Sequence, residues 1–370
     1  MLQKIKGQEN ALELLNKAIE NDRIAQAYLF YGSDGVGKFT AALNFGMAVN
    51  CLATSELKPC GKCDACHKFL QLEHPDFVYL FPTPNLNLSA EGEIKNTEAQ
   101  KSYEAYLQNK INTPWKDFFF KESTEIRKES IALLNKRLEL SIHEAKYRIV
   151  IIEDADMMNN ATANAFLKTL EEPPERTIII LITERLPLIL PTILSRTQPV
   201  YFKPLTRSVI EEILVNEFEI NSAFARSASR ICAGNLKTAI RIASESESLS
   251  SNWAFEIFSL AAKEDDLGYL DLAEKYKKNQ TIDQVIDLLK YIRIIASDLG
   301  SLITNPESEI TNIDKIDFLK PMAEANPKID DRLYDFLLFL EELNRKVEGY
   351  ANLNLVLINL YLNCKLLLKP

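Results

Sequence analysis

Positive charge is in short supply in this chain of 370 residues. Its 43 lysine and arginine residues are outnumbered by 52 aspartate and glutamate residues, which gives a formal net charge of −9. Proteins that hold nucleic acid through overall basicity carry the opposite balance. We therefore expect any contact with DNA to be local or shared with other chains.

Long apolar runs are also missing, which excludes a membrane-spanning segment. The longest apolar stretch, Leu353 to Leu368, is broken by Asn354, Asn359, Asn363 and Lys365. The N-terminus shows no targeting segment, so we expect a cytoplasmic protein. The length predicts two or three domains, and a hydrophobic content of 46% is sufficient for their cores.

Cysteine is sparse, and its distribution does not favour a disulfide framework. Cys232 and Cys364 stand alone in apolar helical contexts, where we expect small buried hydrophobic side chains. The remaining four have the spacing C-x8-C-x2-C-x2-C and are Cys51, Cys60, Cys63 and Cys66. Thiolates at this spacing can converge on one tetrahedral Zn²⁺ ion.

These four cysteines predict a structural zinc site more readily than an iron–sulfur cluster. The usual iron–sulfur run has a further cysteine and a proline, whereas His67-Lys68-Phe69 follows Cys66 here. His67 is the only other nearby candidate ligand. Four thiolates leave no open coordination position, so we expect no catalysis by the metal.

A glycine-rich segment, Gly32-Ser33-Asp34-Gly35-Val36-Gly37-Lys38, has the pattern of a phosphate-binding loop. It follows a strand-like run, Tyr28–Tyr31, and precedes a predicted buried helix, Ala41–Val49. Three glycines, Gly32, Gly35 and Gly37, allow backbone N–H groups to surround an anion at a helix N-terminus. Lys38 can reach the outer phosphates, so the segment predicts nucleotide binding.

The residue after Lys38 departs from the pattern. A hydroxyl side chain there would hold Mg²⁺, but the chain has Phe39. Thr40 follows, yet one helical residue turns the side chain by about 100°. We therefore expect Thr40 to be a poor substitute for the missing magnesium ligand. The chain should hydrolyse ATP weakly or not at all, and the pattern leaves open whether it binds ATP and Mg²⁺.

A second element of a nucleotide site follows an apolar strand-like run at Arg148–Ile152. In a working ATPase this strand ends in Asp then Glu, for the metal and the attacking water respectively. Here the order is reversed, as Glu153 then Asp154. Both carboxylates would lie where ligands of open α/β sheets bind, although a solvated acidic strand end is the alternative.

Further elements indicate an α/β fold. The helix around Asn164–Glu172 is stopped by Pro173-Pro174, and a buried strand follows at Thr177–Thr183. Apolar strands that alternate with helices predict a parallel sheet covered on both faces.

The motifs together resemble bacterial DNA polymerase III clamp-loader subunits of the AAA+ class. The resemblance covers nearly the whole chain and is strongest to the delta-prime type. The gamma/tau motors keep a hydroxyl residue after the loop lysine and an Asp-Glu pair at the strand end, and this chain has neither. It is carried by Gly7-Gln8, Ala27-Tyr28-Leu29-Phe30, the glycine loop, the four cysteines, Leu167-Lys168-Thr169-Leu170-Glu171-Glu172-Pro173-Pro174 and Ser195-Arg196.

The resemblance implies roles for three further residues. Arg196 matches the arginine that reaches into the ATP site of a neighbouring subunit, although Thr197 replaces the family's cysteine. Lys237 matches a nucleotide-sensing arginine, but its ammonium group is a single point charge, whereas a guanidinium is planar and can make two parallel hydrogen bonds. Thr183 matches the polar sensor at a strand end, with Glu184 as the neighbouring alternative. From the residues alone, Arg196 is a surface arginine and Lys237 a solvated helix charge.

Composition and the resemblance together predict three domains. Residues 1–203 form the AAA+ nucleotide-binding module, with a zinc module at 51–66 and a polar insertion at 83–121. Residues 204–243 form a helical lid, and a serine-rich linker follows at Ser244–Ser248. Residues 252–370 form a helical collar. Two amphipathic stripes in it predict core, namely Ile282, Val285, Ile286, Leu289 and Ile292, and then Leu333, Phe336, Leu337, Leu340 and Leu343.

The insertion matches no family pattern. It contains a predicted charged helix near Glu98 to Lys110 and ends in an aromatic cluster, Trp115 and Phe118-Phe119-Phe120. The cluster either docks on a partner or packs back on its own domain, and we expect the second.

The resemblance implies a stator that helps to load the sliding clamp onto primed DNA within a hetero-oligomer of gamma/tau and delta subunits. One alternative is a gamma/tau-like motor that hydrolyses ATP itself. Another is a scaffold in which nucleotide and zinc are only structural.

Overall fold

The computed structural model describes residues 5–54, 58–89, 92–116, 118, 120, 122–244, 249–276, 281–304, 310, 312, 315–349 and 351–369. They divide into two compact units, one made of Met1–Ile210 with Ala233–Thr238 and one of Glu211–Cys232 with Ala239–Pro370. The three predicted domains stay a prediction. The core of the proposed linker, 245–248, lies outside the described residues.

The first unit is built on a five-stranded sheet with the order β2-β3-β4-β1-β5. All neighbouring strands are parallel, which confirms the predicted parallel sheet. The strands are β1 (Ala27–Tyr31), β2 (Phe77–Leu80), β3 (Arg148–Ile152), β4 (Thr177–Thr183) and β5 (Gln198–Tyr201).

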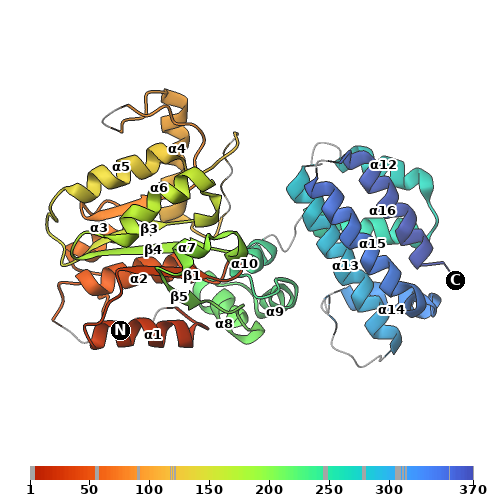
Figure 1. Ribbon diagram of the computed structural model, residues 1–370. Helices are drawn as coiled ribbons and strands as arrows, with labels where there is room; N and C mark the ends of the chain where they lie inside the picture. Colours follow the sequence, from red (N-terminus) through yellow and green to blue (C-terminus); the bar gives the residue numbers. More distant parts are fainter. Residues whose placement is uncertain are drawn as a thin grey trace. The chain divides into compact units, whose positions relative to one another are not determined.

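Helices cover both faces of this sheet (Figure 1). On one face lie α1 (Glu9–Glu20), α2 (Lys38–Asn50) and α3 (Asp64–Leu70), and on the other lie α5 (Lys128–Glu139) and α6 (Asn160–Glu171). Side chains of β4 alternate between the two cores, with Ile178 and Ile180 in one and Ile179 and Leu181 in the other. A strand buried on both faces must be apolar throughout, which explains its continuous run of isoleucine.

Local signals explain where α6 begins and ends. The side chain of Asn159 accepts a hydrogen bond from the Thr162 N–H at 2.9 Å and so caps the first turn. The paired prolines that follow Glu172 lack the N–H groups needed to continue the helix. A further helix of this unit, α4 (Thr97–Asn112), belongs to the polar insertion, and α7 (Pro191–Leu194) is a single turn.

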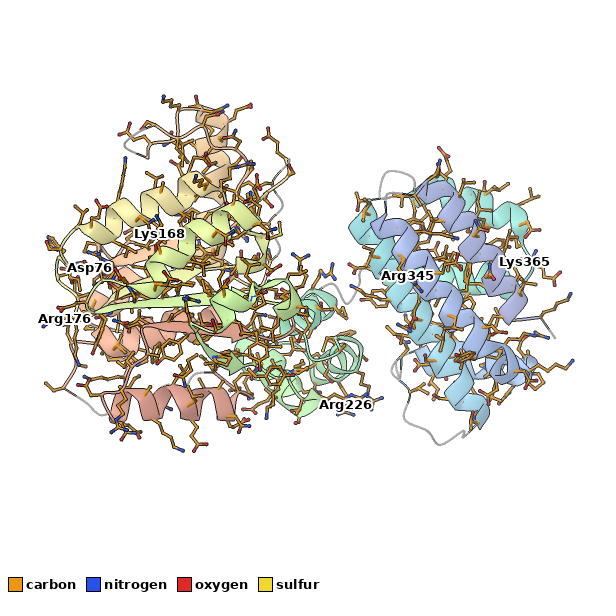
Figure 2. All side chains as sticks on the ribbon, viewed as in Figure 1. Asp76, Lys168, Arg176, Arg226, Arg345 and Lys365 are labelled. Carbon is orange, nitrogen blue, oxygen red and sulfur yellow. The ribbon has the colours of Figure 1, made fainter. Side chains whose placement is uncertain are left out.

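Buried charges fix the connection from α5 into the sheet. Asp76, labelled in Figure 2, is 2% exposed and accepts hydrogen bonds from the backbone N–H groups of His143, Glu144 and Ala145. Arg148 donates to three backbone carbonyls at the end of α5, those of Leu138, Leu140 and Ser141. These bonds replace the water that the groups lose on burial.

The second unit is helical. Its α13 (Ile282–Thr304) contacts α11 (Leu249–Ala262), α14 (Ile316–Ala325) and α15 (Ile329–Glu348). Both predicted stripes supply core residues, among them Leu289 on α13 and Leu340 on α15. The remaining helices are α9 (Ser222–Ile231), α12 (Asp266–Tyr276) and α16 (Leu353–Leu367), while α8 (Arg207–Phe218) and α10 (Leu236–Ser244) contribute residues to both units.

The six cysteines form no disulfide, and Cys232 and Cys364 are buried as expected. Within the described residues, no helix is both long and apolar enough to cross a membrane.

Candidate nucleotide and metal sites

The glycine loop joins β1 to α2, as the sequence predicts. Gly35 has a φ of +67°, and a Cβ atom built there would lie 1.9 Å from Oδ1 of Asn235. A Cβ atom on Gly32 would lie 2.2 Å from the carbonyl oxygen of Phe202. Only glycine fits at these two positions, because backbone or side-chain atoms already fill the space. Gly37 directly precedes α2.

Lys38 is buried at the start of α2 and folds back on the loop. Its Nζ donates to the carbonyl oxygens of Gly32 and Ser33, at 2.9 and 2.5 Å. Burial lowers the pKa of Lys38, while the negative charges of Glu184 and Asp34 oppose that shift. Thr40 is exposed on the same helix.

Asp34 links the loop to α10. Nζ of Lys237 lies 2.8 Å from Oδ1 of Asp34, and Nδ2 of Asn235 donates to Oδ2 at 3.4 Å. Burial acts to raise the pKa of Asp34, but the charge and hydrogen bond of Lys237, the backbone N–H of Gly35 and the charge of Lys38 together hold that pKa below its usual value. The structure thus brings Lys237 to the glycine loop through a carboxylate that sequence reasoning did not single out.

Glu153 lies at the carboxyl end of β3, and both of its carboxylate oxygens have partners. Its Oε1 is 2.7 Å from Nζ of Lys110, and its Oε2 accepts hydrogen bonds from the hydroxyls of Tyr79 and Tyr106. Burial acts to raise the pKa of Glu153, yet the charge and hydrogen bond of Lys110 and the hydrogen bond from Tyr79 act together to lower it below its usual value. Burial first, and the Glu153 charge second, raise the pKa of both tyrosine hydroxyls. None of these three partners was predicted.

Asp154 adopts a left-handed conformation with a φ of +48°. Burial and the neighbouring charges of Glu153 and Asp156 raise its pKa to about 6. Glu184 behaves in the same way, because burial and the charge of Asp34 raise its pKa to about 7. These two carboxylates therefore lack a cation strong enough to offset burial.

Thr183 ends β4, but its hydroxyl is occupied. Oγ1 donates to Oδ1 of Asp156 at 2.6 Å and accepts from the backbone N–H of Arg185 at 3.0 Å. The guanidinium of Arg185 also pairs with Asp156 at 2.6 Å. Glu184, the alternative sensor position, is one of the residues whose charge raises the pKa of Lys38 against the effect of burial.

Phe39 fills the position where a magnesium-binding hydroxyl would stand. Its ring packs on Tyr79 with centroids 5.2 Å apart, and Nζ of Lys110 lies 4.1 Å from its centroid. A cation over an aromatic face is a favourable contact.

Arg196 follows α7 and contacts α6 instead of the glycine loop. Nη2 donates to Oε1 of Glu171 at 2.7 Å, and Nη1 donates to the Thr192 carbonyl at 2.9 Å. Its side chain is 36% exposed.

The predicted metal ligands do converge. The Sγ atoms of Cys51, Cys60, Cys63 and Cys66 all lie within 4.8 Å of one another. Cys60 accepts hydrogen bonds from the backbone N–H groups of Lys62 and Cys63 at 3.4 and 3.3 Å, and these bonds lower its pKa to about 6. Four convergent sulfur donors, one of them held readily as thiolate, fit a tetrahedral metal ion.

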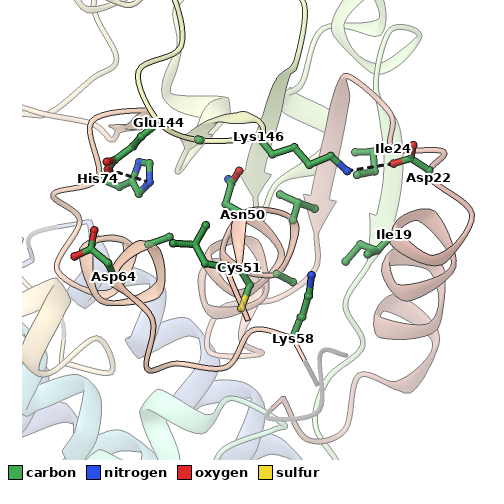
Figure 3. A pocket seen from close by; sticks show the side chains of 15 residues that line it. Ile19, Asp22, Ile24, Asn50, Cys51, Lys58, Asp64, His74, Glu144 and Lys146 are labelled. Atoms are coloured by element: carbon green, nitrogen blue, oxygen red, sulfur yellow. Dashed lines mark ion pairs between the residues drawn. The ribbon is translucent and has the colours of Figure 1, made fainter. Parts of the chain in front are cut away.

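A cavity of about 650 Å³ lies beside this cluster, between α1 and α2 (Figure 3). Cys51, Asn50 and Lys58 line it, together with the ion pair Lys146–Asp22 and a contact of 3.6 Å between Nε2 of His74 and Oε1 of Glu144. Its polar groups are largely engaged with one another, so it offers little to a specific ligand.

Comparisons with known proteins find similarity to subunits of DNA polymerase III. The model of a family described as DNA polymerase III, delta subunit, matches residues 7–206. DNA polymerase III subunit delta' of Bacillus subtilis is 28% identical over 240 residues, which are 65% of this chain and 60% of that one. DNA polymerase III subunit gamma/tau of Mycobacterium tuberculosis is 29% identical over 208 residues, which are 56% of this chain and 29% of that one.

The matched segments therefore span less than two thirds of these relatives' own length. Among solved structures, a DNA polymerase III gamma subunit-related protein of Thermotoga maritima superposes with a TM-score of 0.48 at 17% identity. That superposition covers 97% of this chain and 100% of the other.

Proposed function

The chain belongs to the family described as DNA polymerase III, delta subunit, and from that premise we propose that it is a delta-prime-like stator of a clamp loader. It would act in the cytoplasm in a hetero-oligomer with gamma/tau-type and delta-type subunits, and would help to load a sliding clamp onto primed DNA. Similarity to a delta' subunit over 240 residues supports this choice, while the similarity to a gamma/tau subunit extends over 208.

One observation carries the proposal of a stator over a motor: the glycine loop is kept while both magnesium positions are altered. Gly32, Gly35 and Lys38 keep the residue types of a phosphate-binding loop, and they lie between β1 and the start of α2. Phe39 packs on Tyr79, and Glu153 is bound by Lys110. A loop without its metal partners can hold phosphate but is poorly equipped to hydrolyse it.

Arg196 is the residue proposed to act on a neighbour. Its guanidinium is partly exposed, and its ion pair with Glu171 is at the surface, where such pairs contribute little. A partner's phosphate could therefore compete for it at low cost. The planar guanidinium suits a bidentate contact with phosphate oxygens.

Zinc would be structural in this proposal. The four thiolates would complete a tetrahedral shell, so they would stabilise the segment around α3 without activating water.

The proposal also includes a helical lid at 204–243 and a helical collar at 252–370. Thr183 and Lys237, as nucleotide sensors, belong to it as well.

The test is a reconstituted clamp loader assembled with and without this chain. We expect DNA-stimulated ATP turnover and clamp loading to require the chain, and the isolated chain to turn over little ATP. Substantial turnover by the isolated chain would identify a motor. If the complex needs the chain for assembly but works equally well without the Arg196 side chain, the chain is a scaffold.

A further inference from the structure

The polar insertion, which the family resemblance leaves without a role, lies against the candidate nucleotide site. Its helix α4 is capped by Asn96, whose side chain accepts hydrogen bonds from the N–H groups of Glu98 and Ala99. Tyr106 anchors the helix, because its ring stacks on Phe81 with centroids 4.0 Å apart. Phe81 directly follows β2.

The end of the insertion strengthens this anchor. Phe118 and Phe120 both pack on Tyr106, with ring centroids 5.6 Å away in each case. For these two residues the prediction that the cluster packs on its own domain is confirmed, while Phe119 lies outside the described residues. The C-terminal half of α4, which carries Tyr106, is therefore held in place by aromatic contacts.

Lys110 stands in that last turn and points at the altered magnesium position. Its side chain is 10% exposed, with Nζ 2.7 Å from Oε1 of Glu153 and 4.1 Å from the Phe39 ring centroid. One ammonium group thus contacts both positions at which the chain departs from a hydrolytic site, the residue after Lys38 and the first carboxylate after β3.

The two departures are chemically consistent with each other. A hydroxyl would coordinate a magnesium ion, whereas an aromatic face attracts an ammonium group. Tyr79 and Tyr106 complete the arrangement by donating to the other oxygen of Glu153. Both oxygens of this buried carboxylate are then satisfied without a metal.

We propose that Lys110 is a built-in substitute for the divalent cation of the nucleotide site. Its ammonium group lies between Phe39 and Glu153, and a metal ion can reach Glu153 only if Lys110 is displaced. The insertion would thereby keep the site folded and closed to magnesium. This inference rests on the proposed function in treating the glycine loop as a nucleotide site.

The experiment uses the full chain and Mn²⁺ as the probe, alone and with ADP. Lys110→Met removes the ammonium group while keeping an unbranched side chain of similar length. Lys101→Met is the matched control, because Lys101 is exposed on the same helix. The double variant Lys110→Met/Glu153→Gln removes the carboxylate as well. Thermal unfolding and the number of bound Mn²⁺ ions are measured for each protein.

We expect Mn²⁺ to leave the unfolding midpoint of the wild type and of Lys101→Met unchanged. Without metal, Lys110→Met should melt about 5 °C or more below the wild type, because a buried carboxylate loses its partner. Mn²⁺ should restore part of that loss, with one ion bound. The double variant should lose both the binding and the restoration.

Two results would overturn the inference. Mn²⁺ binding by the wild type that depends on Glu153 would show that Lys110 does not exclude metal. A destabilised Lys110→Met that binds no Mn²⁺ would reduce the contact to a structural ion pair. If Lys110→Met does not fold, the same titration on Lys110→Gln decides. None of these measurements involves clamp loading. The proposed role of Lys110 and the proposed clamp-loader function can therefore fail independently of each other.

Discussion

The guanidinium of Arg196 is held by the carboxylate of Glu171 across a distance of 2.7 Å. The two residues come from segments that carry the family resemblance, the Leu-Lys-Thr-Leu-Glu-Glu-Pro-Pro helix and the Ser-Arg pair. The pair is partly exposed at both ends, with 36% and 48% of the side chains accessible. The contact orients the arginine but leaves it available to a stronger anion, such as a phosphate of a neighbouring subunit.

Arg196→Ala should leave folding, zinc content and complex assembly intact and should slow the whole complex. An arginine supplied to a γ-phosphate is worth about 10³–10⁵ in rate in GTPases, and only the site that faces this chain would lose it. DNA-stimulated ATP turnover and clamp loading by a reconstituted complex are the measurements. Arg196→Lys should rescue poorly, since an ammonium group cannot form the planar contact.

The control for Arg196 is Arg207→Ala, which removes an exposed arginine at the start of α8. It should leave turnover and loading at the wild-type level. A complex carrying Arg196→Ala that also loads clamps at the wild-type rate would show that the arginine does not act on a neighbour.

Purified protein should contain one tightly bound zinc ion per chain. Structural zinc is worth on the order of 10 kcal/mol in small peptides, so Cys63→Ser should lose the ion and loosen the segment around α3. The sheet should stay folded, because its core is formed largely by other residues. Metal analysis and hydrogen exchange would measure both effects. Cys232→Ala should keep its zinc, and iron in place of zinc would contradict the prediction.

Phe39→Thr should fail to create an ATPase. The substitution restores a hydroxyl, but Glu153 remains bound to Lys110 and its neighbour Asp154 is still the shorter carboxylate. We expect turnover by the isolated variant to stay below about 1 s⁻¹, the lower end of the usual enzyme range. Phosphate release is the measurement, with Lys38→Ala as the blank. Rapid turnover that Lys38→Ala abolishes would reveal a motor.

Asp154→Asn should stabilise the protein more at neutral pH than at acidic pH. The folded pKa of about 6 lies above the unfolded value of about 3.9, so the folded state binds the proton more tightly. Wild-type stability therefore falls as pH rises from about 4 to about 6 and is constant above that.

Asparagine carries no charge and tolerates a left-handed backbone, so the variant escapes this loss. We expect its advantage to grow by about 1 kcal/mol over that range, less than the full pKa difference because the side chain is only partly buried. Denaturant unfolding at several pH values would measure it. An advantage that does not change with pH would show that Asp154 ionises normally in the folded protein.

Short-range patterns made the central sheet and the metal cluster predictable. The isoleucine runs of β3 and β4 can only be buried on both faces, and close cysteine spacing leaves few ways to arrange four thiolates. The edge strands β2 and β5 escaped prediction. Each has only four residues, and β5 contains Pro199, which an edge position tolerates because it needs no hydrogen bond on its free side.

The sequence by itself determined the glycine loop, its altered residue Phe39 and the four cysteines, because the chemistry of each lies in neighbouring residues. Only the tertiary structure decided what those residues meet. Lys110 reaches Glu153 across 43 positions, and Asn235 reaches Asp34 across 201. No periodicity or spacing encodes such pairs, because they form only when folding of the first unit brings these distant residues together. Burial then strengthens the interaction between charged partners.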